Sequence, residues 1–214
     1  TGVRSLAHGH GYFAADALYE DAVTEGTLPF DFETFQANPA EVRIQAFQRD
    51  TGCTLRFGKK GMADVVRLMD IVRASSTLPG AMTPRPVDGH VLYDGGLGEG
   101  AGLPVCMAEK DGFARTFFVA TRPRGYRKQP PTPAEQRLYE RLAADYPFLF
   151  KALLTRWERY NDELERIERL AAAGSIYAVW PERMMVSSGT TSATLLNAQY
   201  EAGRAQAIRQ MPLW

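Results

Sequence analysis

The sequence predicts an α/β layered domain, because strand-like segments alternate with helical ones along its 214 residues. Segment 114–121 contains a continuous apolar run, Phe117-Phe118-Val119-Ala120, which is typical of a strand covered on both faces. Segment 62–74 is apolar nearly all round, as expected for a well-buried helix. Apolar residues make up 45% of the chain and charged residues 23%, as in ordinary globular proteins. We therefore expect a single domain over residues 1–214.

Residues 1–128 hold the expected α/β core. Segment 41–47 alternates apolar and polar residues and segment 53–57 is strand-like, and the Asp50-Thr51-Gly52 turn joins them into a hairpin. Asp88-Gly89 is a second turn signal, directly before strand formers. The remaining core elements are expected in this order: a short helix from 31 that Pro39 ends, the helix over 62–74, a strand over 87–93, and a short helix over 103–110.

Residues 129–214 read as a mainly helical extension of the same domain, with one strand at 176–180. Thr132-Pro133-Ala134-Glu135 is a capping box with proline at the first helical position, so a helix begins there and Pro147 interrupts it. Apolar residues at three- and four-residue spacing predict a long amphipathic helix from 150 to 172. A final helix over 192–210 is expected to turn five side chains inward: Leu195, Leu196, Tyr200, Ala205 and Ile208.

Charge and composition exclude several classes of function. Lys plus Arg number 25, as do Asp plus Glu, so no overall field attracts nucleic acid and no nucleic-acid partner is expected. No run of eighteen apolar residues could span a membrane, and the first thirty residues lack a signal-peptide pattern. Cys53 and Cys106 have no Cys or His at ligand spacing, which predicts free, buried thiols. The expected location is the cytoplasm.

The candidate site lies in residues 87–105. A short apolar run delivers one carboxylate, Asp94, into a loop that holds five glycines between 95 and 102. Glycines allow backbone conformations closed to other residues and let a ligand come close. A carboxylate placed in this way suits general-base chemistry. The alternative is a structural carboxylate that accepts N–H bonds from its own loop, and the residues alone favour that alternative.

Other motifs do not lead to a cofactor or a metal. Residues 96–101 fit the loose G-x-G-x-x-A form of a dinucleotide loop, but Gly102 and Pro104 follow and no long helix continues from it. The phosphate-binding sequence G-x-x-x-x-G-K-[ST] is absent. His8-Gly9-His10 lacks a nearby third ligand and is more typical of a loop than of a metal site. We therefore expect no cofactor and no metal.

Two stretches leave a choice between a ligand and an ordinary structural role. Arg122-Pro-Arg-Gly-Tyr-Arg-Lys128 holds four cations and one aromatic residue, which could bind a phosphate or an anionic head group. A solvated surface loop is the commoner interpretation. The apolar face with Phe148, Phe150 and Trp157 could meet lipid, but such stripes more often belong to the core.

Asp94-Gly95-Gly96 after a strand, preceded by Ala74-Ser-Ser-Thr-Leu-Pro79 at a helix end, resembles the second half of the patatin-like phospholipases. Residues 31–35, the Thr51-Gly52 turn and residues 121–128 are similar to the bacterial acyl hydrolase and esterase branch of that group. The resemblance covers about residues 18–128. It implies a three-layer α/β fold with a central, mostly parallel sheet, and hydrolysis of lipid or other carboxylic esters by a Ser–Asp dyad.

By this resemblance Asp94 is the dyad aspartate, the general base that acts directly on the serine, and Gly95 and Gly96 give it room. The family's serine stands in G-x-S-x-G, a frame that no serine of this chain occupies. Since the chain also begins at Thr1, we expect a C-terminal fragment, truncated at the N-terminal side of the sheet and inactive alone. The intact protein would act on a lipid or acyl ester.

A second hypothesis comes from a different class, a non-catalytic module that binds an anionic ligand or a protein partner through residues 122–128. The truncation hypothesis has its own consequence. Missing strands would leave an open sheet edge and uncovered apolar surface. We therefore expect self-association of this chain, and peripheral membrane contact is the further partner expectation.

Overall fold

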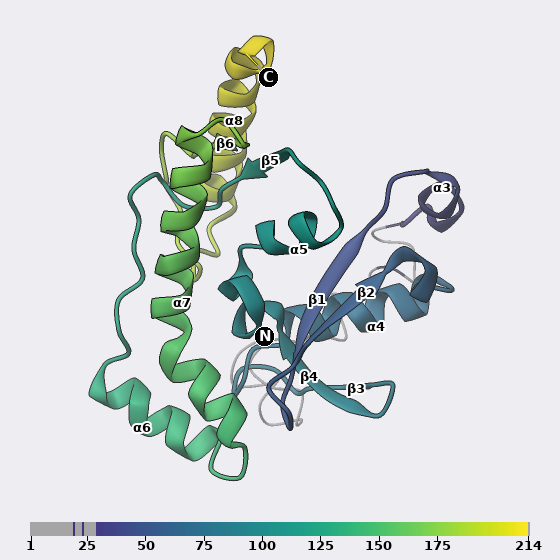
Figure 1. Ribbon diagram of the computed structural model, residues 1–214, viewed down its shortest axis with the longest axis vertical. Coiled ribbons are helices and arrows are strands. Elements are labelled where there is room, and N and C mark those ends of the chain that lie inside the picture. Colours follow the sequence, from purple (N-terminus) through teal and green to yellow (C-terminus); the bar gives the residue numbers. More distant parts are fainter. Residues whose placement is uncertain (1–18, 20–22, 24–28, 214) are drawn as a thin grey trace. The chain divides into compact units, whose positions relative to one another are not determined.

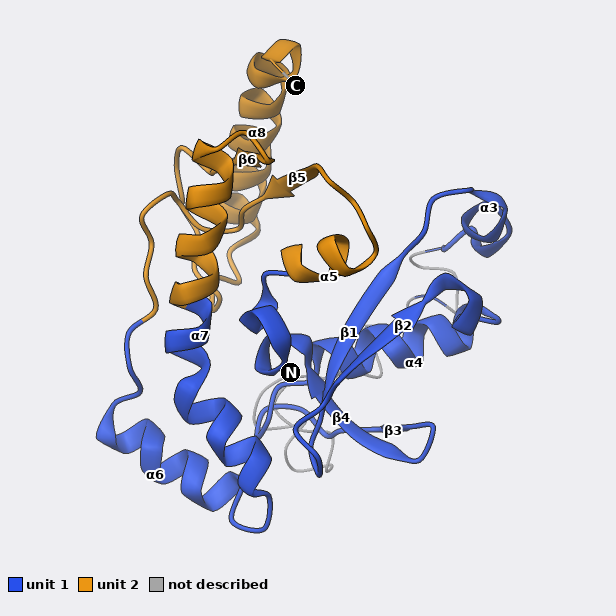
Figure 2. Ribbon diagram, in the orientation of Figure 1, with its two compact units in different colours: residues 1–104, 129–160 blue, residues 105–128, 161–214 orange. Residues whose placement is uncertain are grey.

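The computed structural model describes Tyr19, Val23 and residues 29–213, and it contains both helices and strands (Figure 1). The His8-Gly9-His10 motif lies outside the described residues. The chain divides into two compact units (Figure 2). Unit 1 comprises residues 1–104 and 129–160, and unit 2 comprises residues 105–128 and 161–214. The helices and strands establish the α/β character of the chain. The single domain over 1–214 stays a prediction.

Unit 1 contains a four-stranded sheet in the order β2-β1-β4-β3, in which every pairing is antiparallel. β1 (Arg43–Gln48) and β2 (Thr54–Gly58) form the predicted hairpin. β3 (Pro86–Val87) and β4 (His90–Asp94) form a second one. In the turn between β3 and β4, Asp88 and Gly89 have φ of 52° and 76°, the positive values that a tight hairpin of this twist requires. This sheet is therefore not the mostly parallel one expected, because short turns can join only antiparallel neighbours.

α3 (Phe32–Ala37) and α4 (Val65–Ser76) begin at side-chain caps. Asp31 accepts a hydrogen bond from the Thr34 N–H at 2.9 Å, and Asp64 accepts one from the Arg67 N–H at 2.7 Å. Such caps satisfy N–H groups that the first helical turn leaves open. α4 packs on the sheet. The core between them consists of buried apolar side chains: Ala46, Met62, Leu68, Ile71, Ala74, Val87 and Leu92.

α6 (Pro133–Leu142) begins with the predicted capping box, in which the Glu135 carboxylate accepts from the Thr132 N–H at 2.7 Å. α7 (Pro147–Ala172) is the predicted long helix, and it contributes to both units (Figure 2). Within unit 1 it builds a second core, in which Phe47 and Leu97 meet Leu149 and Ala152. Phe150 packs against this core, whereas Phe148 is about half exposed. The start of α7 therefore lies against the loop that follows β4.

Unit 2 contains α5 (Val105–Lys110), β5 (Thr116–Val119), β6 (Ile176–Val179) and α8 (Ala193–Gln210). β5 and β6 pair in parallel, since two helices separate them in the sequence and give the chain room to return. The prediction that β5 is covered on both faces is wrong. Phe118 is 7% exposed, but Phe117 and Val119 on the opposite face are 47% and 63% exposed.

The final helix is confirmed, but its predicted inward face is wrong. Leu195, Leu196, Tyr200, Ala205 and Ile208 are all exposed, and the buried residue of α8 is Gln206, at 6% exposure. The cause is hydrogen bonding. Gln199 and Gln206 turn toward the segment 180–185 and bind its backbone. The helix therefore presents its glutamine and alanine side to the rest of unit 2.

Neither cysteine forms a disulfide bond, as expected, but the predicted burial of both is wrong. Cys53 is exposed, because it stands at the end of the β1–β2 hairpin, directly after the turn at 50–52. Cys106 is half-buried on α5. In the part of the chain that the structure describes, no helix has the length and apolar content needed to cross a membrane.

Candidate active site

Asp94 is the last residue of β4, and two neighbours fix its backbone. It stands opposite Ala46 of β1 in the antiparallel ladder. Its N–H donates to the carbonyl oxygen of Thr77, the residue that ends α4, at 2.8 Å. The helix-end segment Ala74–Pro79, which precedes Asp94 in the predicted motif, is thus in contact with it through Thr77. The side chain of Asp94 is half-buried.

The two carboxylate oxygens of Asp94 have different surroundings. Oδ1 accepts a hydrogen bond from the Gly96 N–H at 2.6 Å and so caps the short 3-10 helix η3 (Gly95–Leu97). Oδ2 has no hydrogen-bond partner among the described residues. The bond made by Oδ1 is the loop contact that a structural carboxylate would make. It also holds the carboxylate in one orientation while Oδ2 keeps its capacity to accept a proton.

Gly95 and Gly96 are buried where no side chain fits. A Cβ at position 95 would lie 2.4 Å from the carbonyl oxygen of Gln45. A Cβ at position 96 would lie 2.6 Å from both Asp94 Oδ1 and Arg156 Nη2. The loop continues through η4 (Glu99–Gly102), where Gly100 and Gly102 have φ of 70° and 96°. The glycines therefore allow a tight backbone close to the carboxylate.

Gln45 of β1 ties this loop to the sheet. Its side-chain amide donates to the carbonyl oxygens of Gly95 and Glu99 at 2.9 and 3.0 Å. Thr54 of β2 adds a third tie, because its hydroxyl accepts from the Glu99 N–H at 2.8 Å. The amide oxygen of Gln45 is buried and has no partner within the described residues. Both strands of the first hairpin thus position the loop.

Two arginines of α7, which the sequence patterns did not predict as site residues, also belong to the site. Arg159 donates to the carbonyl oxygens of Gly98 and Leu97 at 2.8 and 3.1 Å. Burial lowers the pKa of Arg159, and repulsion from Arg156 lowers that pKa further. Arg156 places Nη2 beside Gly96, and its buried Nε has no partner in the described part of the chain. The sequence signal for them was a pair of cations three residues apart, bordering the apolar stripe of the helix.

A cavity of about 360 Å³ lies on the α7 side of the loop within unit 1. Its walls combine the apolar groups of Phe47, Leu97 and Phe148 with the polar side chains of Thr54, Lys151, Thr155 and Arg159. Its charge includes two cations and the carboxylate of Glu99. Such a mixed lining suits a ligand with an apolar part and an anionic or ester part.

The basic loop 122–128 belongs to unit 2, whereas Asp94 belongs to unit 1. Arg127 pairs with Glu168 of α7 at 2.7 Å, and this hydrogen bond lowers the pKa of Glu168. Arg122 donates to the Ser188 hydroxyl at 3.1 Å and lies 5.2 Å from the centre of the Tyr126 ring. Much of the charge of this loop is therefore already used in contacts inside unit 2.

Comparison with protein-family models gives two matches. Residues 2–107 match the patatin-like phospholipase model, and residues 146–214 match a domain of unknown function, DUF6363. No curated protein matches the chain. The first match contains all four strands of unit 1, together with Asp94 and its glycine loop. The second match contains the whole of α7, along with β6 and α8.

Proposed function

Since the chain belongs, through residues 2–107, to the patatin-like phospholipase family, we propose that Asp94 is the general base of a lipid acyl hydrolase. The observation that carries this proposal is the asymmetry of the Asp94 carboxylate. Gly96 orients the group through Oδ1, while Oδ2 has no partner in the described part of the chain. An oriented carboxylate with one open oxygen is what direct proton transfer from a hydroxyl requires.

The proposed reaction uses a serine and Asp94 without a histidine between them. The serine oxygen attacks the acyl carbonyl carbon while its proton moves to Asp94 Oδ2. The bond between that carbon and the alcohol oxygen then breaks, and the alcohol leaves with the proton. Water hydrolyses the acyl-serine by the same route, giving a proton to Asp94 that returns to the serine oxygen. The products are an alcohol and a carboxylic acid, and Asp94 ends unchanged.

The serine does not come from a G-x-S-x-G frame within residues 1–214, since none occurs there. We propose that a further segment supplies it, together with strands that complete a central, mostly parallel sheet in three layers. In this proposal the 214-residue chain is a C-terminal fragment that carries the base and lacks the nucleophile. Gly95 and Gly96 are its other site residues, because they let the segment with the serine approach.

The purified 214-residue chain is expected to hydrolyse a short-chain p-nitrophenyl ester at the background rate only, because no activated serine is present. Release of p-nitrophenol measures this directly. Asp94→Asn in the same chain is the matched control and should give the same background. Turnover that a fluorophosphonate serine inhibitor blocks would contradict the proposal, since it would reveal a nucleophile within these residues.

The alternative, a non-catalytic module for an anionic ligand or a protein partner, has less support. In the candidate loop, Arg127 already forms an ion pair with Glu168, and Arg122 already donates a hydrogen bond to Ser188. A cytoplasmic location remains a prediction. Peripheral membrane contact is proposed on the exposure of Phe148, an aromatic side chain of the type that enters a lipid interface.

We also propose that this chain self-associates, through the exposed apolar side of α8. Leu196 and Tyr200 are one turn apart there and are 46% and 66% exposed. Exposed apolar groups gathered on one element favour association. Light scattering at high concentration should give a mass above that of the monomer, and Leu196→Glu should lower it. Asn197→Glu, the adjacent exposed position, is the control. A monomer for the parent chain would refute self-association.

A further inference from the structure

A second cavity, of about 440 Å³, lies entirely within unit 2, between α8 and the strands β5 and β6. It falls in the size range of small-molecule sites. α8 contributes small residues to its wall, Ala202, Gly203 and Ala205, so no large side chain fills the space. The strands contribute the partly exposed Phe117 and Val119. The walls of this α8 pocket are therefore mainly apolar.

The two side-chain amides that line the α8 pocket are already hydrogen-bonded to the backbone. Gln206 accepts from the Glu182 N–H at 3.1 Å and donates to the Trp180 carbonyl oxygen at 2.8 Å. Gln199, two turns earlier, accepts from the Met185 N–H at 2.7 Å and donates to the Arg183 carbonyl oxygen at 3.1 Å. Because these amides are bound to the backbone, they offer a ligand little. The interior of the pocket thus selects an apolar group.

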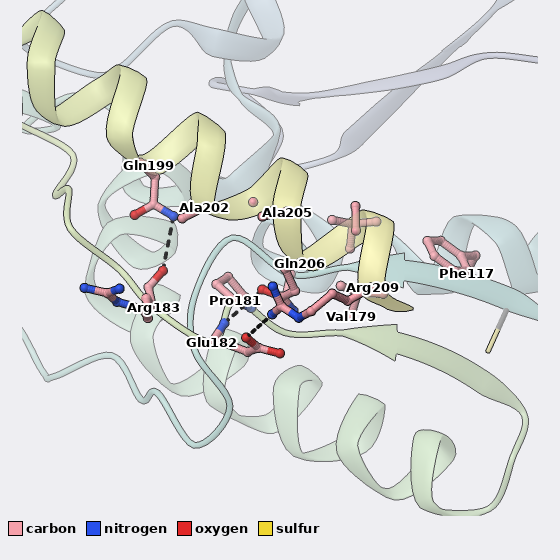
Figure 3. A pocket seen from close by; sticks show the side chains of 14 residues that line it. Phe117, Val179, Pro181, Glu182, Arg183, Gln199, Ala202, Ala205, Gln206 and Arg209 are labelled. Atoms are coloured by element: carbon pink, nitrogen blue, oxygen red, sulfur yellow. Dashed lines mark hydrogen bonds and ion pairs between the residues drawn. The ribbon is translucent and has the colours of Figure 1, made fainter. Parts of the chain in front are cut away.

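Charged side chains at the rim of the pocket indicate which chemical group the other end of the ligand carries. The lining includes two cations, Arg183 and Arg209, and one anion, Glu182. Arg209 pairs with Glu182 at 2.7 Å, whereas the exposed guanidinium of Arg183 has no ion-pair partner in the described part of the chain. Figure 3 shows Arg183 at one end of the labelled residues and Phe117 at the other, with Gln206 and Arg209 between them. The pocket is cationic at one end and aromatic at the opposite end.

We propose that the α8 pocket binds one long-chain fatty acid, with its carboxylate near Arg183 and its chain running along Ala202 and Ala205 toward Phe117. Pocket chemistry alone selects an anionic amphiphile with a single slender chain, since small residues line the helix side. The choice of a fatty acid among such amphiphiles rests on the proposed function, because ester hydrolysis releases one. Unit 2 would then hold a product of the reaction at a site separate from Asp94.

The test is a fluorescence titration of the 214-residue chain with dansylaminoundecanoic acid, followed by displacement with oleate. Ala202→Phe fills the pocket and should weaken binding about tenfold or more. Ala198→Phe, one turn earlier on α8 and not in the lining, is the matched control and should bind like the parent. Circular dichroism of each variant checks that it is folded.

Arg183→Gln tests the head group without touching the packing. It should weaken oleate binding about two- to fivefold and leave displacement by oleyl alcohol unchanged, since an exposed charge contributes modestly. Arg204→Gln, exposed on α8 outside the lining, should change neither. The proposal fails if oleate does not displace the probe, or if folded Ala202→Phe binds like the parent. It also fails if Ala198→Phe weakens binding equally. Asp94→Asn should bind like the parent, so this result is independent of whether Asp94 is the base.

Discussion

Replacing Asp94 by asparagine should reduce ester hydrolysis at least about a thousandfold in a product extended to include the G-x-S-x-G segment. The asparagine oxygen can still accept the Gly96 N–H that Asp94 Oδ1 accepts at 2.6 Å, so the loop keeps its shape. The amide cannot take up the serine proton, however. Steady-state rates on a p-nitrophenyl ester measure the loss, and the unfolding midpoint should stay close to that of the parent.

The matched control is Asp88→Asn in the same hairpin. Asp88 is exposed and has φ of 52°, a left-handed conformation that asparagine accepts readily. Its loss removes the ion pair with Arg67, which at an exposed site is worth about 0.5 kcal/mol. Rates for this variant should match the parent. If Asp94→Asn retained activity within tenfold of the parent, Asp94 would not be the base.

Asp94 and its glycine loop could be predicted from local sequence signals. Strand formers before Asp94, the Asp88-Gly89 turn and the following glycines are each encoded within a few residues, because steric limits on φ act locally. The sequence therefore indicated a carboxylate at a strand end. The open Oδ2 needed the structure, since it depends on which loop N–H groups turn toward Asp94.

The contribution of α7 to the site depends on contacts between residues about sixty positions apart in the sequence. Arg159 reaches the carbonyl oxygens of Leu97 and Gly98 because α7 returns to the glycine loop, and no local pattern specifies that return. The buried side of α8 was missed for a different reason. Hydrophobic periodicity favoured Leu196 and Tyr200, but the irregular segment 180–185 has backbone groups that need hydrogen-bond partners, and Gln199 and Gln206 supply them.

Gly95→Ala should be the most destabilising small substitution in the glycine loop, by about 3 kcal/mol. The new Cβ would lie 2.4 Å from the Gln45 carbonyl oxygen, which belongs to the backbone of β1 and cannot rotate away. Relief requires moving β1 from β4 or lifting the loop that holds Asp94. The unfolding midpoint should fall by about 6–12 °C for a chain of this size.

Gly98 and Gly61 provide the comparison variants for Gly95→Ala. Gly98→Ala meets the Thr54 hydroxyl at 2.5 Å, but that group ends a side chain and can rotate, so the cost should be clearly smaller than at position 95. Gly61→Ala meets nothing within 4 Å and should change stability by less than about 0.5 kcal/mol. Urea unfolding of the three variants in the 214-residue chain should rank Gly95→Ala as least stable. Equal midpoints for Gly95→Ala and Gly61→Ala would show that the loop does not press on β1, and the fixed position of Asp94 would lose its support.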